Sequence, residues 1–440
     1  MRKVCYFVRN RLRKYIVIRC RPDCLEIWKR FSLISERDYL LNRWDSIKFA
    51  TKPNMMRTVL PIFCLLVVVC APLVCQAQTY TNPVLEFDSP DPTVIRDTSG
   101  FYYMFTTESS RGIPIYRSKN LIRWTLIGTV FSEATRPSFV KDGSLWAPSI
   151  HRIGSQYVLY YAMSTWGGQW DCGIGVATAN NLWGPWTDHG KLFVSKDIGV
   201  KNSIDPCIGE ENGHLFLFWG SFCGIFAIEL TSDGLSVKAG EAPRQVAGTL
   251  IEGACIYKRD SWYYLIGSVG TCCSGLESTY HLVVARSASL LGPYVDKNER
   301  SAIENHFSTL LTASDEVAGP GHCSEIVTDD ANNTWMLYHG WLRRDEDAGR
   351  VVFLDQLKWT ENGWPTIESG HPSVKANAPV INTTSLITVL PVDRKEKLDP
   401  KVLRYSLSGI QIHGDNSNLR RQVVIPQIRN YAPNMIQKRK

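Results

Sequence analysis

The chain has 440 residues, of which 44% are hydrophobic and 11% aromatic, enough to bury the core of one large domain or two ordinary ones. The formal net charge is +7, but residues 1–57 alone hold 15 basic and 5 acidic residues. Residues 79–392 hold 23 basic and 33 acidic residues, a net charge of −10. Because affinity for nucleic acid depends on basic groups that neutralise phosphates, this balance excludes a nucleic-acid partner for the central region.

A targeting segment is predicted at residues 55–78. Met55-Met56-Arg57 precedes an uncharged apolar run from Val59 to Cys75, and small residues follow, with an expected cleavage after Ala77. This is the form of a secretory signal peptide, and the protein is expected to be secreted, periplasmic or held at the cell surface. Residues 1–54 are then a gene-model extension or a disordered leader. The alternative is a cytoplasmic segment followed by a signal anchor.

From residue 79 to about residue 382 the pattern is β throughout. Short runs rich in Val, Ile, Tyr, Phe and Trp alternate with turns of Gly, Asp, Asn and Ser. Five aromatic runs recur with a singular residue ahead of each, which indicates five copies of one supersecondary unit. The runs are Phe101–Thr107, Gln156–Met163, Leu215–Gly220, Trp262–Ser268 and Trp335–His339.

Radial repetition of four-stranded units explains this count and avoids long open sheet edges. The sequence therefore predicts an all-β fold, a five-bladed β-propeller over residues 79–382. A β-sandwich is the alternative, but it does not account for one singular residue ahead of every aromatic run. Residues 383–440 are expected to form a short basic C-terminal extension of unknown role, with a small hairpin near Ser406–Ile412.

Seven cysteines lie beyond the leader: Cys172, Cys207, Cys223, Cys255, Cys272, Cys273 and Cys323. An odd number leaves at least one thiol free or paired outside the chain. There is no CxxC motif, so the spacing is not that of a zinc framework. Most of these cysteines are expected to be small buried residues of inner strands.

The singular residues carry the chemistry of the predicted fold. Inner strands of a propeller run along the central channel, so residues at their starts converge at one mouth. Carboxylates head three units (Asp91, Asp205 and Glu252), and Trp146 and His322 head the other two. Clustered carboxylates raise one another's pKa, which leaves one protonated as an acid beside an ionised base. That pair is what glycoside hydrolysis needs.

In these motifs the chain resembles glycoside hydrolase family 43, specifically its arabinan endo-1,5-α-L-arabinosidases. The resemblance covers about residues 80–373. The matching stretches are SPDPTV at 89–94, LWAPSI at 145–150, STWG at 164–167, NSIDP at 202–206, WGSF at 219–222, IEGA at 251–254, GTCCSGLESTY at 270–280, GPGH at 319–322 and LYHG at 337–340.

The resemblance implies a role for each carboxyl group in the hydrolysis of α-1,5-linked L-arabinan with inversion. Asp91 matches the general base that activates water, and Glu252 matches the general acid. Asp205 matches the carboxylate that tunes the pKa of the acid. The implied partner is a plant cell-wall polysaccharide, the arabinan side chains of pectin, and no stable protein partner is implied.

Further residues match positions that line the sugar site in the family. The substrate-binding residues expected on this basis, besides Asp91, are Trp146, Trp166, Gly167, Asn202, Ser221, Phe222, Cys223 and Arg350. Core packing is the alternative for the two tryptophans. Two departures from the family pattern concern subsite details: Ser149 stands where relatives usually have Asp, and Cys223 where they have Trp or Arg.

His322 matches a histidine that in arabinanases helps to hold a metal, usually calcium, largely through water. Calcium prefers oxygen ligands, so a water-rich shell is needed to reconcile that ion with an imidazole. A hydrogen-bonded core histidine is the alternative, and His339 is the second choice for the metal site.

Two other functions stay open at this point. One is exo-acting cleavage by an α-L-arabinofuranosidase or β-xylosidase of the same family. The other is an inactive propeller that binds glycans, which the three intact carboxylates disfavour.

Overall fold

The computed structural model describes residues 78–109, 112–382, 404–405 and 411–412. Two compact units divide the chain, Met1–Gln76 and Ala77–Lys440, and every described residue belongs to the second. The predictions for residues 1–54, for the leader at 55–77 and for most of 383–440 therefore lie outside the described residues. Within the described extension, β24 (Arg404–Tyr405) pairs antiparallel with β25 (Gln411–Ile412).

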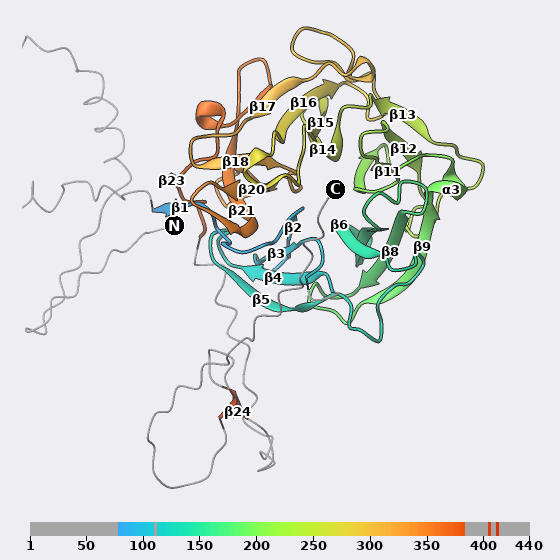
Figure 1. Ribbon diagram of the computed structural model, residues 1–440, viewed down its shortest axis with the longest axis horizontal. Coiled ribbons are helices and arrows are strands. Elements are labelled where there is room, and N and C mark those ends of the chain that lie inside the picture. The colour runs from blue at the N-terminus through green and yellow to red at the C-terminus, as the bar shows by residue number, and fades with distance from the viewer. Residues whose placement is uncertain (1–77, 110–111, 383–403, 406–410, 413–440) are drawn as a thin grey trace, which may run out of the picture. The chain divides into compact units, whose positions relative to one another are not determined.

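Five antiparallel sheets surround a central channel, which confirms the predicted propeller (Figure 1). Blade one consists of β2 (Thr93–Arg96), β3 (Tyr102–Phe105), β4 (Pro114–Ser118) and β5 (Trp124–Thr129). Blade two consists of β6 (Ser144–Ile153), β7 (Gln156–Ser164), β8 (Gly173–Ala179) and β9 (Thr187–Val194). Blade three consists of β10 (Cys207–Glu211), β11 (His214–Trp219), β12 (Ile225–Glu229) and β13 (Arg244–Ala247).

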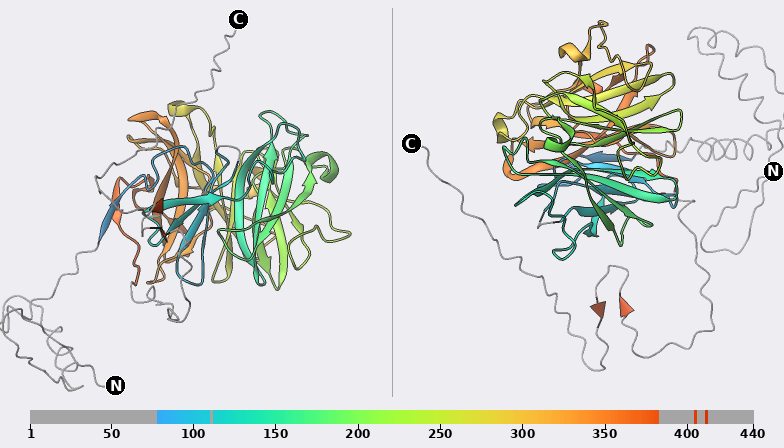
Figure 2. Two further views of the ribbon diagram at one scale, coloured as in Figure 1. Left: turned by 90° about the horizontal axis from the view of Figure 1, so that it is seen from below. Right: turned by 90° about the vertical axis from the view of Figure 1, so that its right-hand side faces the viewer.

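Blade four consists of β14 (Glu252–Arg259), β15 (Trp262–Val269), β16 (His281–Ser287) and β17 (Ser308–Leu311). Blade five consists of β18 (Val317–Gly321), β20 (Thr334–Leu342), β21 (Asp345–Trp359) and β22 (Pro365–Thr366), and β19 (Val327–Thr328) also pairs with β20. The five aromatic runs of the sequence form the second strands, β3, β7, β11, β15 and β20. In side view the strands run between the two faces of the ring (Figure 2).

Helical structure is limited in the described residues to short segments: α3 (Ser195–Ile198) and the 3-10 turns η2 (Gly275–Glu277), η3 (Ala302–Glu304) and η4 (Glu368–Gly370). None of the helices in the described part of the chain is long and apolar enough to cross a membrane.

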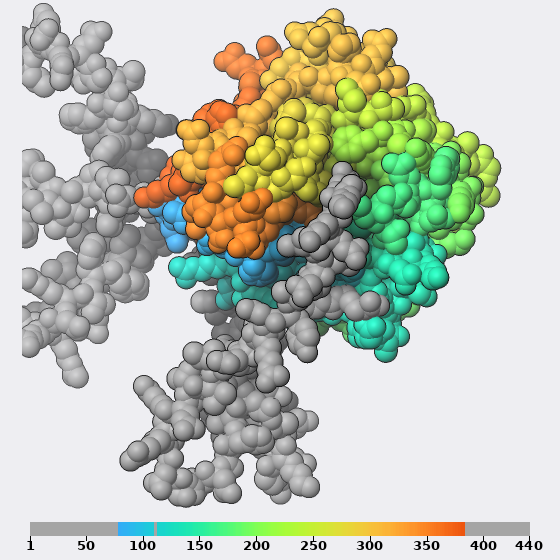
Figure 3. Space-filling model, in the orientation of Figure 1, coloured from blue at the N-terminus to red at the C-terminus, as the bar shows by residue number. Residues whose placement is uncertain are grey.

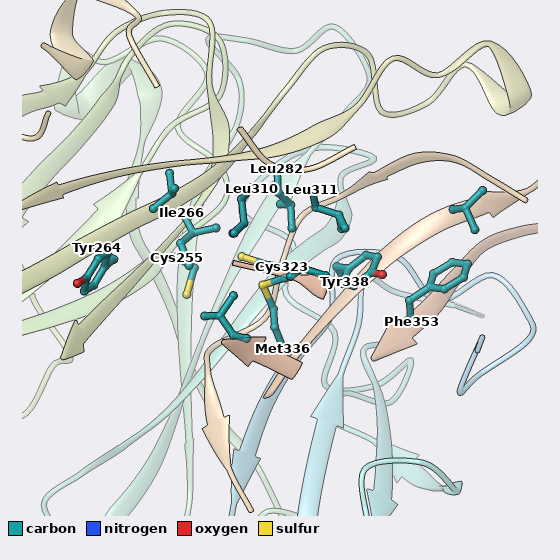
Figure 4. Close-up of a cluster of buried hydrophobic side chains, with 14 of the residues drawn as sticks. Cys255, Tyr264, Ile266, Leu282, Leu310, Leu311, Cys323, Met336, Tyr338 and Phe353 are labelled. Carbon is teal, nitrogen blue, oxygen red and sulfur yellow. The ribbon is translucent and has the colours of Figure 1, made fainter. Parts of the chain in front are cut away.

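Each of the five contacts between neighbouring blades contains one cluster of buried hydrophobic side chains. Between blades four and five, Tyr264, Met336 and Tyr338 are at most 1% exposed, and Figure 4 shows these side chains gathered between the two sheets. Burial of one such side chain stabilises the fold by roughly 1.5–3 kcal/mol. The sheets of neighbouring blades consequently pack face to face around the ring, and the space-filling view shows the blades in contact with one another (Figure 3).

The ring closes through the segment that precedes blade one. β1 (Thr79–Thr81) pairs with β23 (Lys375–Asn377), and Leu85 bridges to Val352 of blade five. Asn82 fixes this register with two hydrogen bonds to Leu354, one donated by Nδ2 to the carbonyl (2.9 Å) and one accepted by Oδ1 from the main-chain N–H (3.0 Å). The described N-terminal residues thus join the last blade to the first.

A left-handed backbone corner occurs near the channel mouth in every blade. The residues with positive φ are Asp91 (57°), Ala147 (41°), Asp205 (58°), Gly253 (57°) and His322 (49°). This geometry corrects the expectation that the singular residues are equivalent. Asp91, Asp205 and His322 occupy the corner itself. Trp146 and Glu252 each precede the corner of their blade by one residue. The strands that contain them, β6 and β14, have a register shift at this point. Glu252 therefore reaches the mouth from a different backbone position than the two aspartates.

Candidate active site

A cleft of about 580 Å³ lies at this end of the channel, and all three predicted catalytic carboxyl groups, Asp91, Asp205 and Glu252, line it. Each of them is at most 9% exposed. A larger hollow of about 1010 Å³ lies at the outer edge of blade five, around Ser314 and Ser373, but none of the singular residues lines it. The smaller cleft is therefore the candidate active site.

Four side chains contact Asp91. Thr107 donates a hydrogen bond from Oγ1 to Asp91 Oδ2 (2.5 Å), and His339 Nδ1 accepts one from the Asp91 main-chain N–H (3.1 Å). His322 Nδ1 lies 3.3 Å and Arg350 Nη1 3.6 Å from Asp91 Oδ1. The carboxylate is thus fixed in one orientation, with its charge facing nitrogen atoms.

The environment of Asp91 favours its ionised form. Burial alone would raise its pKa, but His322, which is charged at the low pH where Asp91 titrates, the Arg350 guanidinium and the hydrogen bond with His339 hold it well below the usual range. Burial also lowers the pKa of His322, and it lowers that of His339 to about 4. Since both imidazoles are then neutral near pH 7, the Arg350 guanidinium is the lasting positive charge beside Asp91.

Asp205 and Glu252 have the opposite character. Burial, followed by the charges of Glu252 and Asp91, raises the pKa of Asp205 well above its usual range. Burial likewise raises the pKa of Glu252, against hydrogen bonds from Ser221 and Tyr280 that lower it. The two titrate as a coupled pair, because ionisation of one disfavours ionisation of the other.

Hydrogen bonds fix the positions of this pair. Ser221 donates from Oγ to Glu252 Oε2 (2.6 Å), and Asn202 donates from Nδ2 to the Ser221 carbonyl (2.9 Å). Asp205 Oδ2 accepts the main-chain N–H of Gly253, the residue after Glu252, at 3.2 Å. The cleft therefore presents one ionised carboxylate, Asp91, together with a pair of carboxyl groups in which ionisation of one makes the other retain its proton. Chemically, such a site is able to take a proton from one reacting group and give one to another.

Most of the residues expected to bind substrate line the same cleft. These are Trp146, Trp166, Gly167, Asn202, Ser221, Phe222 and Arg350. Cys223 is a free, half-buried thiol outside the lining, although its neighbour Phe222 takes part in it. Trp166 is 81% exposed, so core packing is not its role. It meets the half-buried Trp146 in a T-shaped arrangement, with 6.4 Å between ring centroids. Their roles in binding stay predictions.

Calcium near His322 also stays a prediction. Calcium takes six to eight oxygen ligands, whereas His322 directs Nδ1 at Asp91 and donates its main-chain N–H to Ser268 Oγ (2.8 Å). Within the described ranges, no group of three or more His, Cys, Asp or Glu side chains is arranged to hold a metal ion. These side chains alone do not fit a calcium ion, and the proposed reaction does not involve one.

Two residues of the site were not singled out from the sequence. Thr107 follows the aromatic strand β3, and only the fold brings it to Asp91. Tyr280, at the end of the Gly270–Tyr280 loop, is buried, stacks on His339 and hydrogen-bonds to Glu252. In a single sequence, nothing about a tyrosine that follows a turn indicates that it contacts a catalytic residue.

A five-bladed propeller whose channel mouth combines an ionised carboxylate with a carboxyl group that retains its proton is the arrangement of an acid–base glycosidase. Comparison with known proteins agrees. Residues 80–365 match the model of glycosyl hydrolases family 43. The chain belongs to this family and is a glycoside hydrolase.

Curated relatives include arabinan endo-1,5-α-L-arabinosidase C of Emericella nidulans, 35% identical over 62% of this chain and 89% of the relative. An extracellular exo-α-(1→5)-L-arabinofuranosidase of Cellvibrio japonicus is 30% identical over 69% of this chain and 91% of the relative. Among solved structures, the Cellvibrio cellulosa α-L-arabinanase complexed with arabinohexaose has a TM-score of 0.60 and 29% identity, covering 64% of this chain and 96% of that one.

Proposed function

We propose that the protein hydrolyses α-1,5-linked L-arabinan with inversion of anomeric configuration. The observation that carries the proposal is the opposite protonation of Asp91 and Glu252 within one cleft. The substrate is taken from the relatives, whose names specify α-1,5-linked arabinan or arabinofuranosides. Relatives described as extracellular also support secretion, and cell-wall arabinan is the corresponding partner.

In the proposed reaction Asp91 is the general base. It removes a proton from a water molecule as the water oxygen attacks the anomeric carbon. Glu252 is the general acid and gives its proton to the glycosidic oxygen as the bond between that oxygen and the anomeric carbon breaks. Asp91 ends protonated and Glu252 ionised, and exchange with solvent restores both.

The neighbouring groups set up this starting state. Arg350 keeps Asp91 ionised. In the working state Asp205 is the ionised member of the coupled pair, so its charge opposes ionisation of Glu252, and its Oδ2 accepts the main-chain N–H of Gly253, the residue after the acid. Asp205 is thus the modulator that keeps the acid protonated and oriented. Trp146 and Trp166 offer aromatic faces to the sugar rings.

Exo-acting arabinofuranosidase is the second candidate function, since an exo-acting relative matches this chain nearly as well as the endo-acting ones do. β-Xylosidase activity has less support from the relatives. An inactive glycan-binding propeller does not account for three intact carboxyl groups with opposed protonation.

The product profile tests these functions. The purified protein is incubated with linear arabinan, branched arabinan and arabinoxylan, and early products are separated by size. Mixed oligosaccharides from linear arabinan are expected. Arabinose alone from the first time point would indicate exo action, and release from arabinoxylan alone would contradict the proposal.

A further inference from the structure

A vicinal disulfide, Cys272–Cys273, lines the active-site cleft. It lies at the tip of the loop between β15 and β16, where Cys273 is exposed and Cys272 half-buried. The other cysteines in the described ranges are free thiols: Cys172, Cys207, Cys223, Cys255 and Cys323. No step of the proposed hydrolysis uses this disulfide.

The loop is anchored by contacts that do not involve the sulfur atoms. Thr271 and Thr279 exchange hydrogen bonds from each main-chain N–H to the other's Oγ1, at 3.1 and 3.2 Å. Trp341 donates from Nε1 to the Cys272 carbonyl (3.0 Å), and Glu346 Oε1 accepts the Leu276 N–H (3.1 Å). These bonds tie the loop to itself and to blade five without using the sulfur atoms, and both cysteines line the cleft.

The loop belongs to the side of the cleft that carries Glu252. Its first end follows β15, whose Ser268 pairs with Glu252, and its last residue, Tyr280, hydrogen-bonds to the Glu252 carboxyl group. Trp166 and Gly167 of blade two also line the cleft. When a sugar chain lies across the carboxyl groups, the part on the leaving-group side of the scissile bond extends past Glu252 toward the loop that carries the disulfide.

We propose that Cys272–Cys273 forms the binding surface for the sugar on the leaving-group side of the scissile bond. A disulfide has no strong hydrogen-bond donor, and its sulfur atoms are polarisable, so it suits the C–H face of a furanose ring. The inference rests on the proposed function, because the leaving side is defined by Glu252 as the acid.

The test compares the wild-type enzyme with the double variant Cys272→Ser/Cys273→Ser, using arabinohexaose as substrate. Serine keeps the backbone carbonyl that accepts from Trp341 but cannot form the disulfide and places polar hydroxyls at the surface. We expect kcat/KM to fall about five- to tenfold, mostly through a higher KM, with a changed ratio of early products. An unchanged KM and product ratio would overturn the proposal.

Reduction provides an independent arm that needs no substitution. Tris(carboxyethyl)phosphine attacks the disulfide and is hydrolysed to its phosphine oxide. Water supplies the oxygen and two protons, while the disulfide takes up two electrons and becomes two thiols. Treatment of the folded wild-type enzyme should reproduce the rise in KM, and the double-serine variant should not respond. Equal responses of the two proteins would contradict the proposal. A wild-type enzyme that leaves arabinohexaose intact would instead contradict the proposed function, and the leaving-side surface with it.

Discussion

Arg350 Nη1 lies 3.6 Å from Asp91 Oδ1 and supplies the lasting positive charge beside this carboxylate. The arginine comes from β21 of blade five, whereas Asp91 precedes β2 of blade one, so the closure of the ring brings the two together. An ionised base therefore depends on the contact between the last blade and the first.

Replacement of Arg350 by Ala should lower kcat/KM about a hundredfold, as loss of a positioned charge in a water-poor site commonly does. Loss of the cation raises the pKa of Asp91, so the base becomes protonated at higher pH. The acidic limb of the profile of kcat/KM against pH should consequently move to higher pH. Arg343→Ala, on blade five but outside the cleft, is the matched control. If the acidic limb of the Arg350→Ala variant does not move, Arg350 does not control the pKa of Asp91.

Replacement of Glu252 by Gln should reduce kcat on arabinan by about 10²–10⁴-fold, the usual contribution of a positioned general acid. Glutamine preserves the size of the side chain and accepts the hydrogen bond from Ser221, but it cannot give up a proton. The alkaline limb of the pH profile should also disappear, because that limb reflects ionisation of the acid as pH rises through its raised pKa. Initial rates from pH 4 to pH 9 measure both effects, with the exposed Glu210→Gln as control. Full activity in the Glu252 variant would assign the acid elsewhere.

Asp205→Asn should shift the alkaline limb to lower pH. Ionisation of either carboxyl group raises the pKa of the other, so removal of Asp205 lets Glu252 lose its proton more easily. Near neutral pH the rate should fall by about one to two orders of magnitude, whereas the acidic limb, which reflects Asp91, should change less. A shift of the alkaline limb to higher pH would show that Asp205 does not oppose ionisation of Glu252.

Glu325 connects three blades deeper in the channel. Its Oε2 accepts hydrogen bonds from Thr93 Oγ1 (2.5 Å) and the Val94 N–H (3.1 Å), and Oε1 accepts from Ser149 Oγ (3.0 Å). Burial raises the pKa of this carboxyl group despite these hydrogen bonds. The folded protein therefore loses stability as pH rises from the ordinary glutamate pKa, about 4.3, through the raised value.

Glu325→Gln removes that ionisation while its amide oxygen still accepts the bonds from blade one. The variant should gain stability relative to wild type as pH rises from 5 to 8. Glu325→Leu leaves buried donors without partners and should cost about 1–3 kcal/mol for each donor. Urea unfolding at both pH values measures these differences. A glutamine variant that loses stability with rising pH as steeply as wild type would contradict this account.

The fold was predictable because its strongest signals are local. Five aromatic runs with turn residues between them define the second strand of each blade, and the residues ahead of them locate the channel mouth. The three carboxyl groups were found in this way, from their place in a repeat. The offset of Glu252 was not predictable, since the backbone corner occurs at Gly253 in blade four and at the carboxylates in blades one and three.

The contacts between segments that lie far apart in the chain could not be predicted from one sequence. Thr107 and Tyr280 are ordinary residues in their own strand and loop, and their meetings with Asp91 and Glu252 depend on how the blades are arranged in space. The same holds for Glu325, which follows the GPGH motif in the chain but accepts hydrogen bonds from blades one and two. Periodicity predicts which residues form a strand, but it does not predict which loops meet across the channel.

The stereochemistry of the first product tests the central claim most directly. Proton NMR spectra recorded during hydrolysis of linear α-1,5-arabinan resolve the anomers of the new reducing end before they interconvert. If Asp91 activates water while Glu252 protonates the leaving oxygen, the β-anomer should appear first and the α-anomer should follow by mutarotation. Initial appearance of the α-anomer, or no new reducing end at all, would contradict the proposed reaction.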